Sequence, residues 1–138
     1  IAWGSDVSEQ GFTRNGTAVA LAEVNATTGS DQERWIGKAD AKEEAKVALP
    51  AEVTVTQEMR QEGYDRKTTT DDHGMHIYGL AQDQNGTKYF MVKNSWGESG
   101  KYKGIWYASE TFVKFKTMNI VVHKDALPKD IKKKLGIK

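Results

Sequence analysis

Two segments of alternating polarity on either side of an Asn–Gly pair constrain the fold of this chain more than any other feature. Residues 74–81 and 87–93 have a period of about two, which is typical of strands with one buried face. Asn85 and Gly86 stand between them and favour a tight type I′ turn, in which both central residues need a positive φ. The sequence therefore predicts an antiparallel hairpin in the second half of the chain.

Further strands are predicted on both sides of this hairpin. They cover residues 1–7, 104–109 and 119–123, and a short helical turn over 110–115 separates the last two. Strands that follow one another this closely favour a twisted antiparallel sheet or half-open barrel. Together with the flanking helices predicted below, this places the chain in the α+β fold class.

Three helices are expected outside these strands. Thr54 and Gln57 have the spacing of a capping box, so one helix is predicted to start at Thr54 and to end near Gly63. A second helix is expected over residues 31–46. The third covers residues 129–135, near the end of the chain.

The end of the chain combines this last helix with a basic charge. Pro128 suits the first turn of the helix, and Gly136 suits its end. Residues 124–138 carry six lysines and two aspartates. We interpret them as a solvated amphipathic tail. Contact with nucleic acid is the weaker alternative, because a run of lysines alone is weak evidence for it.

The composition limits the chemistry that the chain can perform by itself. A chain of 138 residues, 38% hydrophobic and 28% charged, suits one globular domain. No apolar run approaches the roughly 20 residues that cross a bilayer, so no membrane contact is expected. The chain contains no cysteine. A disulfide, a zinc–thiolate site and a cysteine nucleophile are therefore excluded within it.

Three histidines, His73, His76 and His123, are the candidates for acid–base chemistry. His73 and His76 lie three residues apart on or beside one strand, so alternation sends them to opposite faces and disfavours a shared metal. The consecutive residues Asp71, Asp72 and His73 diverge in direction and are an equally poor cluster. We therefore expect no metal. A single histidine at the start of a strand is most simply a hydrogen-bonded structural residue.

Asn94 changes the interpretation of His73. An antiparallel hairpin brings the start of its first strand close to the end of its second, so the two residues are expected to be neighbours. The asparagine oxygen would accept from one imidazole nitrogen and leave the other free to face a nucleophile, as a thiolate–imidazolium pair requires. Trp96 would shield that bond from water. The simpler alternative is that Asn94 caps a turn and Trp96 belongs to the core.

The segments around these residues resemble a known family. Two segments resemble the histidine and asparagine boxes of papain-like cysteine peptidases, namely Thr70–Met75 (TDDHGM) and Lys93–Gly97 (KNSWG). More narrowly, residues 53–138 resemble the C-terminal part of the bleomycin hydrolase/aminopeptidase C branch. The other segments that match this branch in order are Trp3–Val7, Gly104–Tyr107, Ile120–Val122 and Ala126–Pro128.

The resemblance implies a role for each residue of the predicted pair. His73 would be the general base and acid of a Cys-His-Asn triad, Asn94 would orient it, and Trp96 would pack over their hydrogen bond. The family's catalytic cysteine and oxyanion-hole glutamine lie upstream, and this sequence contains neither segment. Residues 1–138 are therefore expected to be a single C-terminal, His- and Asn-bearing portion of the enzyme. Alone it should be inactive, and its missing N-terminal half would be its partner.

The resemblance also assigns residues 135–138 to a C-terminal arm. In that branch the arm lies in the active-site cleft, and its terminal carboxylate meets the α-amino group of the peptide substrate. Ile137 and Lys138 would make this contact here, and removal of Lys138 would leave Ile137 as the functional end. A frayed tail is the alternative.

The function implied is that of a cysteine aminopeptidase that needs no cofactor. The branch further implies a homohexamer, and we expect a cytoplasmic location. The rival hypothesis is a non-catalytic peptide-binding or regulatory domain that kept the papain-like fold and lost the nucleophile.

Overall fold

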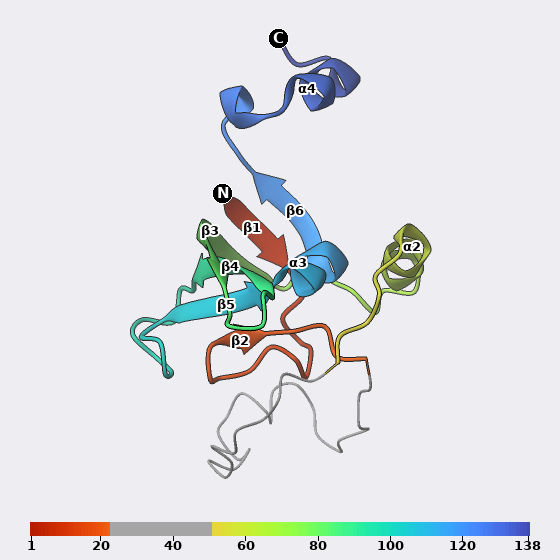
Figure 1. Cartoon of the computed structure of the whole chain (residues 1–138). Coiled ribbons are helices and arrows are strands. Elements are labelled where there is room, and N and C mark those ends of the chain that lie inside the picture. The colour runs from red at the N-terminus through yellow and green to blue at the C-terminus, as the bar shows by residue number, and fades with distance from the viewer. Residues whose placement is uncertain (23–50) are drawn as a thin grey trace.

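The structure is a computed structural model that describes residues 1–22 and 51–138 (Figure 1). The helix expected over 31–46 lies outside the described residues. The strands are β1 (Ala2–Ser5), β2 (Thr17–Ala18), β3 (His73–Gln82), β4 (Lys88–Lys93), β5 (Ile105–Ser109) and β6 (Thr117–Val121). The helices are α2 (Gln57–Asp65), α3 (Glu110–Lys116), the short 3-10 helix η1 (Lys124–Ala126) and α4 (Lys129–Leu135). None of the helices in the described part of the chain is long and apolar enough to cross a membrane.

The strands form one open sheet in the order β2-β5-β4-β3-β1-β6. Every neighbouring pair is antiparallel except β2 with β5, which is parallel. The predicted α+β fold is therefore confirmed, with a mixed sheet that does not close into a barrel. β1 lies between β3 and β6, so the first residues of the chain join strands that are far away in the sequence.

One face of the sheet carries the hydrophobic core. Buried apolar residues of β1, β3, β4 and β5 form this core. The helix α3 contacts β4 and β5 (Figure 1). Trp3, Trp106 and Phe112 are each at most 2% exposed. Phe12 stacks on Trp106 with ring centroids 5.8 Å apart. These aromatic rings bury the largest areas in the core and therefore dominate its stability.

The hairpin turn differs from the predicted type. Gly86 has a positive φ of 87°, but Asn85 does not, so the turn is not type I′. The N–H of Gly86 donates to the carbonyl of Asp83 at 3.1 Å. The Asp83 carboxylate accepts from the N–H groups of Asn85 at 2.8 Å and Thr87 at 2.9 Å. This aspartate satisfies two backbone donors at once and favours a three-residue loop with glycine in the left-handed region.

The helix predicted to start at Thr54 begins three residues later, at Gln57, and extends to Asp65. Thr56 is its N-cap, and the Thr56 hydroxyl accepts from the N–H of Met59 at 3.2 Å. Before the helix, the N–H of Val53 donates to the carbonyl of Ala20 at 2.9 Å, so this part of the chain is still bound to the N-terminal segment. The last helix, α4, has the predicted bounds and ends at Gly136 with a φ of 66°.

Candidate active site

His73 is the first residue of β3 and pairs with Ser5 of β1. Alternation along β3 places it on the same face as Met75 and Ile77, which are buried in the core. His76 is exposed on the opposite face. The prediction that these two histidines lie on opposite faces of the strand is confirmed.

Asn94 directly follows β4 and is only 3% exposed. Its N–H donates to the carbonyl of Gly104 at 3.0 Å, so the loop between them folds back on itself. Gly104 has a φ of 82°, and a Cβ there would lie 2.0 Å from the carbonyl oxygen of Gly97. Only glycine fits this close approach, and the tight loop fixes where the Asn94 side chain begins.

His73 and Asn94 form a hydrogen bond, as the hairpin geometry predicts. The Nε2 atom of His73 lies 2.7 Å from the Oδ1 atom of Asn94. The backbone N–H of Ser95 also donates to this Oδ1 at 2.7 Å, which identifies the atom as the acceptor oxygen. Nε2 of His73 must therefore donate. Its Nδ1 atom has no hydrogen-bond partner among residues 1–22 and 51–138, so it can serve as a proton acceptor.

Trp96 covers the imidazole of His73. The two rings stack with centroids 4.7 Å apart and planes inclined by 30°. The indole also makes edge contacts with Phe12 and Trp106, so it is attached to the core although it is 37% exposed. An apolar ring in this position lowers the local dielectric and strengthens the bond between His73 and Asn94.

An open groove of about 440 Å³ lies on the side of β1 and β3 that carries His76; Asn94 is in its lining, but His73 is not. Gly4 and Gly74 line it and face each other across β1 and β3. A Cβ on Gly74 would find no atom within 4 Å, so the missing side chain keeps this part of the groove open. The Asn119 amide, also in the lining, donates to the Asp71 carboxylate at 2.6 Å. The sequence predicts an open groove with His73 and Asn94 at its rim, but the lining found here contains only Asn94 of the two. The other lining residues could not be predicted, because they depend on which residues pair across the two strands.

Asp72 directly precedes His73. From the sequence, it is considered only as a member of an unfavourable metal cluster. Its carboxylate accepts from the N–H of Val7 at 2.9 Å. Burial raises the pKa of Asp72; the hydrogen bond from Val7 opposes this, and the nearby carboxyl of Asp6 adds to the rise. The residue therefore belongs to the surroundings of His73.

The structure does not bring the C-terminal arm to His73. α4 and the C-terminus lie beyond the end of β6, away from the rest of the sheet (Figure 1). The groove lining includes neither Ile137 nor Lys138. The carbonyl of Lys138 instead accepts from the Lys124 ammonium at 3.2 Å. The predicted contact of the arm with substrate thus remains a prediction.

The remaining histidine has a local role. His123 is the N-cap of η1, and its side chain accepts from the N–H of Asp125 at 3.3 Å. No group of three or more His, Cys, Asp or Glu side chains that could bind a metal ion occurs within the described ranges 1–22 and 51–138.

Known proteins resemble this chain in sequence and in fold. It is 34% identical over 58 residues to aminopeptidase G of Lactobacillus delbrueckii subsp. lactis and 38% identical over 63 residues to aminopeptidase C of Lactobacillus helveticus. These stretches are 13% and 14% of the two relatives, so the chain spans only a small part of their length.

A solved structure supports the fold. The crystal structure of PepW from Lactobacillus rhamnosis aligns with a TM-score of 0.57 at 20% identity, over 96% of this chain and 25% of PepW. In addition, residues 30–137 match the Peptidase C1-like family. Since this match includes most of the chain, and the sheet with its His–Asn pair has just been described, the chain belongs to the Peptidase C1-like family.

Proposed function

We propose that this chain supplies the histidine and asparagine of a Cys-His-Asn cysteine aminopeptidase. The 2.7 Å hydrogen bond between His73 and Asn94 is the observation that carries this proposal. The chain has no cysteine, so the nucleophile must come from another part of the enzyme. The names of the two relatives, both aminopeptidases, support removal of residues from the N-terminus of a peptide.

The geometry of His73 suits both proton transfers of such a reaction. Nδ1 would take the proton of the cysteine thiol, and the thiolate sulfur would attack the carbonyl carbon of the scissile bond. The imidazolium would then give its proton to the leaving amine, which leaves an acyl-enzyme. Water would lose a proton to Nδ1, attack the acyl carbon and release the free acid and the thiol. Asn94 would hold the ring throughout, because Nε2 stays bound to its oxygen.

The C-terminal arm, residues 135–138, is proposed to select free N-termini. A fixed carboxylate that lies a few ångströms from the α-ammonium of a peptide would favour it over a peptide blocked at that position. The arm would have to leave its position beyond β6 to reach a substrate bound at His73. The homohexamer implied by the family resemblance stays a prediction.

The test is a histidine variant of the complete enzyme, this chain together with its cysteine-bearing part. His73→Ala is expected to lower kcat by several orders of magnitude, on the scale seen when a triad base is lost. His123→Ala is the control, because His123 is an exposed histidine that caps η1 and is not in the groove lining. It should leave kcat nearly unchanged. Near-normal activity of His73→Ala would exclude the triad assignment.

The absence of cysteine also supports a second candidate, a peptide-binding or regulatory domain without catalysis. The two are separated by the thiol-alkylating reagent iodoacetamide. Loss of peptidase activity after alkylation of the complete enzyme supports the cysteine aminopeptidase. Peptide binding that persists without hydrolysis supports the binding domain.

A further inference from the structure

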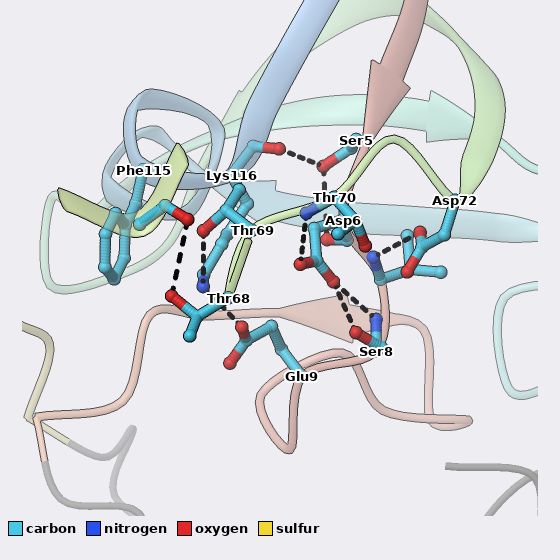
Figure 2. Close-up of polar contacts among 12 residues, drawn as sticks. Ser5, Asp6, Ser8, Glu9, Thr68, Thr69, Thr70, Asp72, Phe115 and Lys116 are labelled. Atoms are coloured by element: carbon cyan, nitrogen blue, oxygen red, sulfur yellow. Dashed lines mark hydrogen bonds and ion pairs between the residues drawn. The ribbon is translucent and has the colours of Figure 1, made fainter. Parts of the chain in front are cut away.

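Three segments that are far apart in the sequence meet in a partly buried polar cluster (Figure 2). One of them leads directly into His73. The first follows β1, the second leads into β3, and the third is the last residue of α3. We call this group the Asp6 cluster, and its members are Ser5, Asp6, Val7, Ser8, Glu9, Thr69, Thr70, Asp72 and Lys116.

Asp6 is the centre of this cluster and is only 1% exposed. One carboxylate oxygen accepts from the N–H of Ser8 at 2.9 Å and from its hydroxyl at 2.6 Å. The other oxygen accepts from the N–H of Thr70 at 2.9 Å. A buried carboxylate is costly unless donors surround it. These donors therefore hold Ser8 and Thr70 in fixed positions relative to Asp6.

Asp72 makes the reciprocal contact. Its carboxylate accepts from the N–H of Val7 at 2.9 Å, so each segment binds the backbone of the other through an aspartate. The ladder between β1 and β3 ends at the pair of Ser5 with His73. Beyond this pair the two side-chain contacts continue the connection between the segments. Residues 70–72 belong to no strand, so these contacts fix the path of the chain into His73.

Lys116 anchors the cluster from the opposite side. Its ammonium forms an ion pair with Glu9 and donates to the hydroxyl of Thr69 at 3.3 Å. Its carbonyl accepts from the N–H of Asp6 at 3.1 Å and from the hydroxyl of Ser5 at 2.9 Å. The segment after β1 is thus bound on one side to α3 and on the other side to the segment that leads to His73.

We infer that Asp6 is a positioning residue for His73. By holding Thr70, it sets the direction in which β3 begins and keeps Nε2 of His73 at Asn94. Within the described residues no hydrogen bond or ion pair joins Asp6 to His73, and the groove lining does not include Asp6, so it acts through the backbone between Thr70 and His73. The effect on turnover rests on the proposed function, whereas the effect on the imidazole does not.

The experiment compares Asp6→Ala with Ser8→Ala in the complete enzyme. Ser8→Ala removes a hydroxyl donor to the same carboxylate and leaves the contact with Thr70 in place. Asp6→Ala is expected to lower kcat by about 10- to 100-fold, because a small misplacement of a catalytic group has effects of this size. KM should change by less than about twofold. Ser8→Ala should change neither constant by more than about twofold.

Proton NMR of the His73 imidazole gives a readout that does not depend on activity. The Nε2 proton should give a sharp, slowly exchanging signal in the unmodified protein and in Ser8→Ala, and a broadened one in Asp6→Ala. Equal effects of the two variants on kcat would overturn the inference, and so would an unchanged Nε2 signal in Asp6→Ala.

If Asp6→Ala does not fold, hydrogen exchange in the unmodified protein decides the question. A protected Thr70 amide supports the inference, and exchange at the rate of an exposed amide overturns it. A different pair of results is expected if the proposed function is wrong but Asp6 does position His73. His73→Ala would then stay active, while the Nε2 signal would still depend on Asp6.

Discussion

Asn94 determines which nitrogen of His73 is available for chemistry. Its oxygen receives two donors, the Nε2–H of His73 and the N–H of Ser95, each at 2.7 Å. Because the second donor is a backbone group, the amide cannot turn over without placing two donors against each other. The imidazole therefore keeps its proton on Nε2, and Nδ1 keeps a lone pair for an incoming proton.

Asp72 is expected to make stability depend on pH. Burial and the carboxyl of Asp6 raise the pKa of Asp72 above its ordinary value of 3.8, despite the N–H of Val7. The folded protein thus binds this proton more tightly than the unfolded chain. The contribution of Asp72 to stability is complete below pH 3.8 and is lost as the pH rises through the raised pKa.

Asp72→Asn tests this dependence, because asparagine keeps an acceptor for Val7 and carries no charge. The variant should match the unmodified protein at about pH 3.5 and exceed its stability at neutral pH by less than about 1 kcal/mol, since the carboxyl is partly solvated. Urea unfolding at the two pH values measures the difference. A variant that is less stable at neutral pH would contradict the prediction.

At the scale of elements, the loop between Asn94 and Gly104 fixes the position of Asn94 in the candidate site. Gly104 binds the N–H of Asn94 through its carbonyl and lies too close to Gly97 to carry a side chain. A change in this loop therefore displaces the asparagine without touching it.

Gly104→Ala is expected to lower the free energy of unfolding by at least about 2 kcal/mol, because it adds a clash to a strained positive φ. Gly97→Ala is the matched control. Gly97 also has a positive φ, 66°, but a Cβ there would meet nothing within 4 Å. It should cost only about 1–2 kcal/mol, the backbone penalty alone. Chemical denaturation measures both values, and equal losses would show that the close approach to Gly97 has no effect.

The hairpin explains why part of the site could be predicted and part could not. β3 and β4 are adjacent in the sequence, and their antiparallel pairing places His73 near Asn94 without further information. The role of Asp6 could be inferred only from the pairing of β1 with β3. This pairing joins residues about seventy positions apart and leaves no local pattern in the sequence. The turn type was mispredicted because an aspartate side chain, Asp83, competes with the preference of Asn–Gly.

At the scale of the whole molecule, the C-terminal segment is the part with the least support from the rest of the structure. No residue of α4 is buried. Removal of residues 136–138 should therefore leave the stability unchanged. In the complete enzyme, the same removal is expected to relax the preference for free N-termini by about tenfold or more, because an ion pair in a sheltered cleft is lost.

Hydrolysis of a free peptide and its N-acetylated form measures this preference. Removal of Lys138 alone is the control and should keep the preference, since Ile137 then supplies the terminal carboxylate. Unchanged selectivity after removal of all three residues would exclude the arm model.

The place of β1 between β3 and the edge strand β6 has a consequence for how the sheet assembles. β1 needs β3 on one side and β6 on the other, and β6 ends at Val121. Pairing over such separations slows folding, because a long loop must close first. Until β6 has paired with β1, that edge of the sheet stays open, and a partly folded chain would expose it to aggregation.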